Sequence, residues 1–377
     1  MRDYQICSNC VMDTTDSAIS FDSQGVCDHC ITYKLDIYPK WQRDLEDRNQ
    51  LSKLVQKIKQ YGVGRDFDCI IGMSGGIDSS YLAYLAKVEL GLRPLIFHVD
   101  AGWNSQEAVN NIEKVVDFLQ LDLFTEVIDW EEMRDLQLAF LKSGVSHIDT
   151  PQDHAFFATM YKFAERHNVR YILTGANYST ECIRNPLEWM YYQSDSTQIL
   201  DIHSQYGSKP LVNYPLTSIL WHKVYLPIVK GIHVIKPLNM LPYLKNDALK
   251  LLKEKVGYQE YPQKHFESRF TRFYEGYWLP KKFGYDTRRV QFSSLILTGQ
   301  MAREDALHLL SFSPLSESSA RQEFEYVADK LRITVEELNS YLVAPNRTFR
   351  DYKSQNWIYE MGAKIFRVLG LERGGKR

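Results

Sequence analysis

The sequence lacks any apolar run of about 18 residues that could span a bilayer, and no charged-then-apolar leader opens it. Charge of one sign is not in excess either, because 45 Lys and Arg residues face 47 Asp and Glu residues, a net charge of −2. This balance disfavours a protein that coats nucleic acid or an acidic membrane, although local basic patches remain compatible with it. We therefore expect a soluble, cytoplasmic globular protein, long enough for one large domain with accessories or for two domains.

Cysteine is scarce outside the first thirty residues, which hold four of the six. These four form two CxxC motifs separated by sixteen residues: Cys7, Cys10, Cys27 and Cys30. Two such motifs can present four thiolates to one tetrahedral zinc ion, which would supply folding energy to a segment too polar to build a core. Two disulfides, or thiols used in redox chemistry or sulfur transfer, are the alternatives, and disulfides fit poorly without a secretion signal. His29 is expected as an exposed neighbour of the metal, Cys69 as a core residue, and the role of Cys182 stays open.

From about residue 61 onward, short apolar runs alternate with amphipathic stretches. Strands are predicted within 67–73, 92–100, 123–129, 169–175 and 232–238, and helices within 76–91, 104–121 and 150–168, after an earlier helix that includes 51–58. Asn104 or Ser105 is the expected cap of the second helix of this series, and Thr150 that of the third. Such alternation predicts an α/β fold with a doubly wound, mainly parallel sheet, in which ligands bind beyond the carboxyl ends of the strands.

The stretch "SGGIDSS" lies at such a position, directly after the first predicted strand. Glycine N–H groups, serine hydroxyls and the start of the following helix can together hold an anion, although a purely structural glycine turn is the alternative. A Walker A loop would carry a lysine for γ-phosphoryl transfer, and this loop has none. Asp78 instead places a carboxylate beside the expected phosphates, an arrangement that Mg²⁺ would have to bridge.

This loop resembles the SGGxDS signature of the PP-loop ATP pyrophosphatases, which adenylate a substrate and release pyrophosphate. The resemblance implies that the loop holds the leaving pyrophosphate. "IFHVDAGW" and "ILTGANYSTE" resemble the segments of that superfamily that border and close on the nucleotide. The implied nucleotide-binding residues are Ser74, Gly75, Gly76, Asp78, Ser79, Ser80, His98, Asp100 and Gly175. A strand end or a solvated loop is the alternative for His98 and Asp100.

A closer resemblance links the chain to the N-acetyl sugar amidotransferases of the WbpG type, which act in surface-polysaccharide (LPS, O-antigen) and flagellar-glycan synthesis. "CSNCVMDTTD", "FDSQGVCDHC" and the long stretch beginning "KHFESRFTRFYEGYW" resemble the family's N-terminal and C-terminal signatures. Read without the resemblance, that C-terminal stretch is a salt-bridged packing surface. With it, His265, Glu267 and Arg269 join Asp78 as candidate catalytic or substrate-binding residues. The Tyr-, Trp- and Pro-rich region 183–232 matches no family feature.

The resemblance implies an ATP-dependent amidotransferase that uses ATP, Mg²⁺ and Zn²⁺ to convert the acetamido group of an activated sugar into an acetamidino group. It also implies ammonia delivered by a separate HisH-like glutaminase, with a HisF-like companion. The expected organisation is a zinc module and linking helix (1–60), a PP-loop domain (61–256), and a helical C-terminal region (257–377) with a frayed tail at 371–377. A tRNA-thiolating PP-loop enzyme and a non-catalytic zinc-ribbon interaction protein are the alternatives, the first disfavoured by the neutral charge.

Overall fold

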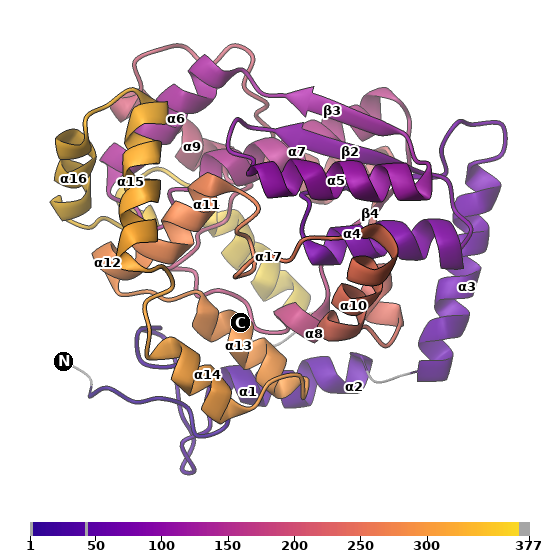
Figure 1. The fold of residues 1–377 in the computed structure, drawn as a ribbon, viewed down its shortest axis with the longest axis horizontal. Helices are drawn as coiled ribbons and strands as arrows, with labels where there is room; N and C mark the ends of the chain where they lie inside the picture. Colours follow the sequence, from indigo (N-terminus) through magenta and orange to yellow (C-terminus); the bar gives the residue numbers. More distant parts are fainter. Residues whose placement is uncertain (1–2, 42–43, 369–377) are drawn as a thin grey trace.

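A computed structural model of the chain describes residues 3–41 and 44–368, and its centre is a five-stranded parallel sheet (Figure 1). The strands are β1 (Cys69–Gly72), β2 (Pro94–Asp100), β3 (Leu123–Val127), β4 (Tyr171–Leu173) and β5 (His233–Ile235). They are ordered β3-β2-β1-β4-β5, with Ile70 of β1 opposite Leu95 of β2 on one side and Ile172 of β4 on the other. The predicted α/β fold with a parallel sheet is confirmed.

Helices cover both faces of this sheet because neighbouring strand residues point to opposite faces. Ile70 packs in a core that includes α6 (Trp130–Ser143), α7 (Thr150–Arg166) and α9 (Ser196–Tyr206). Ile71 packs in a second core on the other face. That second core includes α3 (Asp44–Tyr61), α4 (Ile77–Tyr84), which continues as the π-helical η2 (Leu85–Glu89), α5 (Gln106–Leu119) and α10 (Lys245–Val256).

Two helix starts differ in part from the sequence-based expectation. Ser105 caps α5, and its hydroxyl accepts a hydrogen bond from the Ala108 N–H at 3.1 Å. The cap of α7 is Asp149 and not Thr150, because Thr150 is already helical and its hydroxyl donates to the His147 carbonyl.

The helix α6 was not predicted at all. Its signals were nevertheless present in Asp129, which accepts from two backbone N–H groups, and in Gly144 at its left-handed end.

The region 183–232, which sequence reasoning could not place, packs against the sheet layers. With its surroundings it contains α8 (Tyr178–Glu181), α9, the π-helical η3 (Trp221–Val229) and the 3₁₀ turn η4 (Pro237–Met240). Two carboxylates of α6 fix the extended segment after α9. Glu132 accepts from the Tyr214 N–H at 2.7 Å, and Asp135 accepts from the Ser208 N–H at 2.9 Å. Region 183–232 therefore packs against the sheet layers, which no short sequence motif indicated.

The C-terminal part is helical, as the sequence predicts (Figure 1). Its elements are α11 (Arg269–Phe273), η5 (Tyr274–Trp278), α12 (Leu279–Phe283), α13 (Arg288–Leu297), α14 (Arg303–Leu310), α15 (Glu317–Leu331), α16 (Val335–Val343), η6 (Phe349–Asp351) and α17 (Asn356–Val368). An aromatic core joins Phe270 and Trp278 to Trp103, which lies beyond β2. The expected frayed tail at 371–377 lies outside the described residues.

The N-terminal segment lies against α13 and α14 (Figure 1) and includes α1 (Asp28–Thr32), η1 (Tyr33–Ile37) and α2 (Tyr38–Trp41). Arg303 donates to the carbonyl oxygens of Cys7 and Cys10 at 2.7 and 2.9 Å. Arg289 pairs with the fully buried Asp13 at 3.0 Å. Across residues 3–41 and 44–368, the structure has no helix that is both long and apolar enough to cross a membrane.

Candidate active site

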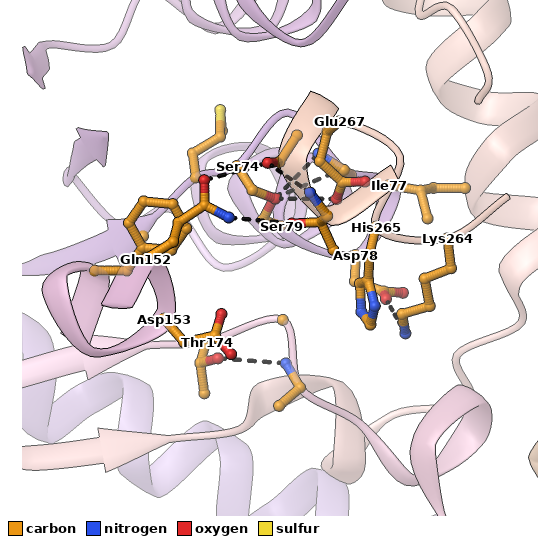
Figure 2. Close-up of a pocket in the computed structure, with 18 of the residues that line it drawn as sticks. Ser74, Ile77, Asp78, Ser79, Gln152, Asp153, Thr174, Lys264, His265 and Glu267 are labelled. Atoms are coloured by element: carbon orange, nitrogen blue, oxygen red, sulfur yellow. Dashed lines mark hydrogen bonds and ion pairs between the residues drawn. The ribbon is translucent and has the colours of Figure 1, made fainter. Parts of the chain in front are cut away.

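A cavity of about 550 Å³ opens at the carboxyl ends of β1, β2 and β4. The loop after β1, the loop after β4, the start of α7 and the segment 258–275 all contribute to its wall. Figure 2 shows side chains of the loop and those of Lys264, His265 and Glu267 at this cavity. Of the residues predicted to bind nucleotide, the cavity is lined by Ser74, Gly76, Asp78, Ser79, His98 and Gly175. Gly75, Ser80 and Asp100 do not line it.

The glycine loop owes its shape to Gly75, whose φ of +86° is favourable for glycine alone. A Cβ at this position would lie 2.8 Å from the carbonyl oxygen of Ala108 in α5. The Gly75 carbonyl in turn accepts hydroxyl hydrogen bonds from Tyr258 and Tyr261, at 3.0 and 3.2 Å. The loop is thus held by its contact with α5 and by two tyrosines of the cavity wall, and Gly76 forms the start of α4.

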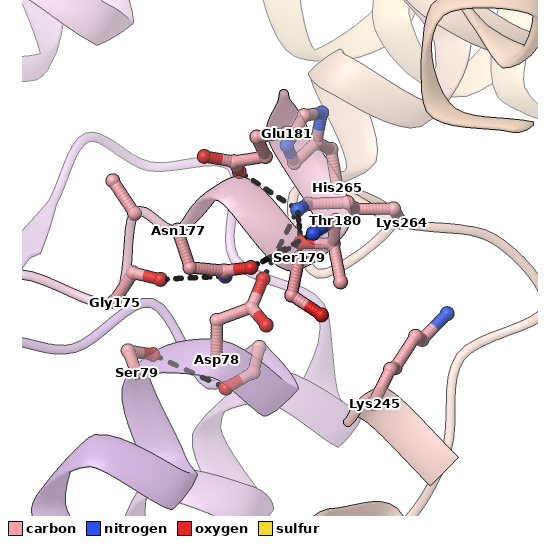
Figure 3. A network of polar contacts seen from close by, with 12 residues as sticks. Asp78, Ser79, Gly175, Asn177, Ser179, Thr180, Glu181, Lys245, Lys264 and His265 are labelled. Atoms are coloured by element: carbon pink, nitrogen blue, oxygen red, sulfur yellow. Dashed lines mark hydrogen bonds and ion pairs between the residues drawn. The ribbon is translucent and has the colours of Figure 1, made fainter. Parts of the chain in front are cut away.

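Asp78 lies at the centre of a polar network that joins three segments (Figure 3). Its carboxylate accepts from the Tyr243 hydroxyl at 2.5 Å and from the Lys264 ammonium at 3.0 Å. Lys264 also contacts Glu181 at 2.7 Å and the Thr180 hydroxyl at 3.2 Å. Burial opposes ionisation of Asp78, but the Lys264 charge and these hydrogen bonds outweigh it and lower the Asp78 pKa. The glycine loop has no lysine of its own, but Lys264, from a segment distant in the sequence, places an ammonium group beside it.

Gly175 lets the loop after β4 approach the first turn of α4. A Cβ on Gly175 would lie 2.8 Å from the backbone carbon of Asp78 and 2.9 Å from the backbone nitrogen of Ser79. The Gly175 carbonyl accepts from the Asn177 side chain, which also caps α8 (Figure 3). This close approach gives Gly175 a structural reason to be glycine.

The segment that carries His265 and Glu267 is tied to the loop between β2 and α5. The Ser105 N–H donates to the Glu267 carbonyl at 2.9 Å, beside an antiparallel bridge between Asn104 and Ser268. The Glu267 carboxylate consequently reaches the Ser74 hydroxyl, at 3.4 Å. Burial is the main reason that the Glu267 pKa is raised.

His265 has the left-handed backbone conformation, with φ of +70°, which is costly for a residue with a side chain. Its Nδ1 donates to the buried Glu275 at 3.1 Å. Burial lowers the His265 pKa, but the Glu275 carboxylate outweighs burial, and the net effect raises the pKa to about 9. His265 therefore faces the cavity as a cation at neutral pH.

The structure does not bring Arg269 to the cavity with the other three candidate catalytic residues. Its guanidinium pairs with Glu323 of α15 at 3.1 Å and lies 3.3 Å from the ring centre of Tyr326. These contacts fit the packing surface that the C-terminal stretch suggested when read without the resemblance.

His98 and Asp100 are both engaged with the protein. Nδ1 of His98 donates to the Met73 carbonyl at 2.9 Å, and Nε2 accepts from Asn104 at 2.9 Å, so His98 braces the start of the glycine loop. Asp100 accepts from the Gly102 N–H at 2.8 Å and from Asn104 at 3.2 Å. The histidine lines the cavity, whereas Asp100 shapes the turn that follows β2.

The cavity has a second, acidic end that sequence reasoning missed. Asp149 is 3% exposed and accepts from the Thr271 hydroxyl at 2.6 Å and from the Gln152 amide at 3.1 Å. His147 lies 3.3 Å from Asp153, and the buried Glu275 completes this wall. Burial and the neighbouring Asp153 raise the pKa of Asp149 to about 8.

Signals for these missed residues were weak for a physical reason. Lys264 directly precedes His265 but belongs to no spacing pattern with Asp78, which lies 186 positions earlier. Asp149 stands before "TP" at the start of α7, and that position indicates a helix cap. Only the fold shows that this cap also lines the cavity.

The four N-terminal cysteines converge into one buried cluster, with all four Sγ atoms within 4.8 Å of one another. Neighbouring Sγ atoms are 3.6 to 3.8 Å apart. The backbone N–H of Cys27 and that of Cys10 point at the Cys7 sulfur, at 3.2 and 3.4 Å. Such donors stabilise thiolates, so this cluster can hold a metal ion. The expectation of an exposed His29 was wrong, because His29 is buried and pairs with Asp16 at 2.9 Å.

Two family models match the chain. The model described as the C-terminal domain of WbpG-like LPS biosynthesis proteins matches residues 267–366, and the asparagine synthase model matches residues 65–176. The first match begins at Glu267, and the second contains the glycine loop, β4 and the start of α7. Both matched segments therefore contribute residues to the cavity wall.

No curated protein matches the sequence. Among solved structures, NMN synthetase from Francisella tularensis is 16% identical with a TM-score of 0.29, covering 80% of this chain and 99% of that one. The U34-tRNA thiolase NcsA from Methanococcus maripaludis, solved with its 4Fe–4S cluster, is 13% identical with a TM-score of 0.35, covering 87% and 89%. The NH₃-dependent NAD synthetase from Campylobacter jejuni is 15% identical with a TM-score of 0.31, covering 79% and 97%.

Proposed function

The chain belongs to the WbpG-type family of the PP-loop ATP pyrophosphatase superfamily, and we propose that it converts the acetamido group of an activated sugar into an acetamidino group. The reaction consumes ATP and ammonia and releases AMP and pyrophosphate. The sugar is a precursor of a surface polysaccharide such as LPS O-antigen, or of a flagellar glycan. The neutral overall charge agrees with a small-molecule substrate better than with tRNA.

The observation that carries this proposal is a single cavity with two unlike ends. One end has the glycine loop with Asp78 and Lys264, and the other has Asp149, Asp153 and Glu275. A nucleotide's phosphates fit the first end and are repelled by the second. Because adenylation requires ATP and the acceptor to meet, one continuous space of about 550 Å³ supports this chemistry.

In the first step, the acetamido oxygen attacks the α-phosphorus, and the bond to the bridging oxygen of pyrophosphate breaks. The N–H groups at the start of α4 and the hydroxyls of Ser74 and Ser79 hold the departing pyrophosphate. Lys264, displaced from Asp78 by the phosphates, neutralises charge on the phosphoryl oxygens. His265, a cation at neutral pH, and Glu267 contact the acceptor.

Asp78 is the carboxylate that would bind Mg²⁺ together with the phosphates. Its two oxygens contact Tyr243 and Lys264, which leaves lone pairs for a cation. Mg²⁺ commonly uses one or two carboxylates plus substrate phosphates, so this donor set fits it. When bound, the ion would offset the repulsion between Asp78 and the phosphates.

In the second step, ammonia adds to the carbon of the adenylylated imidate, and AMP leaves with the electrons of the C–O bond. We propose that a separate HisH-like glutaminase, with a HisF-like companion, supplies this ammonia. Cys182, the cysteine with no role assigned from sequence, is 5% exposed, and its thiol points to the Ser294 carbonyl. Burial raises its pKa to about 12, which makes it a poor nucleophile for glutamine hydrolysis.

The cysteine cluster is proposed to bind one structural zinc ion. A tetrahedron with Zn–S bonds of about 2.3 Å has edges of about 3.8 Å, close to the observed sulfur separations of 3.6 to 3.8 Å. A 4Fe–4S cluster binds each thiolate to a different iron atom, which requires wider spacing. The compact spacing therefore favours a single ion.

The test is mass spectrometry of candidate nucleotide sugars after incubation with MgATP and ammonium chloride. The expected product is lighter than the substrate by the difference between an oxygen atom and an NH group. Adenine products should be AMP and not ADP, and glutamine should replace ammonium only when the glutaminase is added. Formation of ADP, or efficient glutamine use by this chain alone, contradicts the proposal.

A further inference from the structure

The acidic end of the cavity carries three carboxylates and, within residues 3–41 and 44–368, neither lysine nor arginine as their ion-pair partner, which disfavours a phosphate group there. Asp149 and Glu275 are each 3% exposed. Both carboxylates lie on the cavity wall together with the half-exposed Asp153. No lysine or arginine pairs with these three among the described residues; their partners are histidines, hydroxyls and an amide. Glu275 and Asp153 have histidine partners, His265 and His147, whereas the Asp149 carboxylate bonds to a hydroxyl and an amide. A small neutral or cationic ligand therefore suits the Asp149 side of this end.

An independent observation also points to a ligand here. Tyr274 lines the cavity and is 1% exposed, and its hydroxyl has no hydrogen-bond partner among the described residues. Its ring stacks on His147, with 6.0 Å between the ring centres, which fixes the hydroxyl at this end. A buried hydroxyl without a partner is costly, so a ligand that bonds to it would be stabilised.

We propose that this end is the ammonia subsite and that Asp149 is the catalytic base that takes a proton from the incoming nitrogen. The inference rests on the proposed amination. Ammonium donates one proton to the Asp149 carboxylate, and the freed lone pair forms the C–N bond with the imidate carbon. A second proton passes from the added nitrogen to the sugar-bound imidate nitrogen. The C–O bond then breaks, AMP takes that electron pair, and the C=N bond of the acetamidino group remains.

The surroundings of Asp149 suit this role. Its Oδ2 accepts from Thr271 of α11 and its Oδ1 from Gln152 of α7, which orients the carboxylate and leaves further lone pairs free. The charged groups that face it are His147, Asp153 and Glu275. Burial and Asp153 raise its pKa to about 8, and a base with a pKa near the operating pH transfers protons efficiently.

The central test compares Asp149→Asn with wild type in three reactions: pyrophosphate release, amination by ammonium chloride, and amination by hydroxylamine. Hydroxylamine is mostly unprotonated at neutral pH and so needs no base to release its lone pair. We expect Asp149→Asn to keep pyrophosphate release and hydroxylamine use, and to lose ammonium-dependent amination by about 10²-fold or more.

The matched control is Asp195→Asn, because Asp195 is also buried and caps α9 but does not line the cavity. It should lower thermal stability without changing the ratio of aminated product to AMP. If Asp149→Asn uses ammonium within twofold of wild type, or loses ammonium and hydroxylamine alike, the inference is overturned. If wild type itself makes no aminated product, the proposed function fails first, which is a distinguishable result.

A second variant tests the same assignment in case Asp149→Asn does not fold. Thr271→Val removes a hydrogen bond that favours the ionised carboxylate, so it should raise the Asp149 pKa. The base acts only when ionised, and the acidic limb of the pH profile for ammonium-dependent turnover should move to higher pH. An unmoved profile in Thr271→Val would also overturn the assignment of Asp149.

Discussion

The cysteine cluster and the cavity hold their ionisable groups in opposite ways. The cluster gathers four groups that carry like charge when ionised, and neighbouring sulfurs are only 3.6 to 3.8 Å apart. The cavity joins opposite charges, with Asp78 and Lys264 in contact at 3.0 Å. Like charges this close need an ion from outside to be stable, whereas the pair in the cavity is stable until a ligand separates it. The cysteine cluster therefore becomes stable when it binds a metal ion. The cavity, in contrast, must break the contact between Asp78 and Lys264 when it binds its ligand.

The largest effect is expected from removing the metal. Cys10→Ser should abolish zinc binding and release the segment 3–41 from α13 and α14, because structural zinc contributes about 10 kcal/mol or more to such folds. Metal analysis should find one zinc per wild-type chain and none in the variant, and limited proteolysis should cleave only the variant near its N-terminus. Cys69→Ser, at a buried cysteine in β1, is the control that should keep its zinc. Iron with the absorbance of an iron–sulfur cluster would contradict the single-ion assignment.

The next effect tests the pair in the cavity. Asp78→Ala should lower the rate of pyrophosphate release by about 10²- to 10³-fold, since it removes the carboxylate proposed to bind Mg²⁺. Lys264→Met should also slow release, and it should raise the Asp78 pKa by removing the opposite charge. Lys209→Met is the matched control, because Lys209 pairs with Glu131 on the surface and neither residue lines the cavity. Turnover that survives in both cavity variants would mean that the pair is only structural.

The same contrast explains what could be predicted from the sequence. The four cysteines lie within a span of 24 positions, and a CxxC motif is a local structure, so spacing alone located the cluster. The sheet followed from the alternation of strands and helices, and the glycine loop from its place after β1. Arg303, which binds the Cys7 and Cys10 carbonyls, could not be found this way, because no pattern links positions almost 300 residues apart.

The candidate site was predictable only where a family resemblance marked it: at the glycine loop, at His98 and Gly175, and at His265 and Glu267. Lys264 and Asp149 reach the cavity because the segment 258–275 and the start of α7 fold across the strand ends. Neither residue belongs to a sequence motif from which its contact partner could be identified. For Arg269 the sequence suggested a role that its position in the structure does not support. As a basic residue in a segment that resembles the family, it was expected to bind substrate. At the start of α11, however, its side chain pairs with Glu323. The catalytic assignments of Asp78, His265, Glu267 and Arg269, and the limits of the three proposed domains, stay predictions.

A smaller effect concerns the loop that supports the pair. Gly75→Ala places a side chain at φ +86° and 2.8 Å from the Ala108 carbonyl, which together should cost about 1–3 kcal/mol in backbone strain. We expect weaker ATP binding, measured by calorimetry, as the loop shifts. Gly231→Ala has a similar φ of +63° but open space around it, so it isolates the cost of the backbone conformation. Equal ATP affinity in the two variants would show that contact with α5 does not shape the loop.

The smallest effect is expected at Arg269, where the packing reading and the substrate-binding reading predict different measurements. Arg269→Lys keeps the charge that pairs with Glu323 but loses the flat guanidinium over Tyr326. If Arg269 packs α11 against α15, the variant should lose about 1 kcal/mol of stability. The KM for the sugar should then stay at the wild-type value. Chemical denaturation measures the first quantity and steady-state kinetics the second. A KM raised severalfold with unchanged stability would return Arg269 to the substrate side, and would mean that the cavity extends further toward α15 when the sugar is bound.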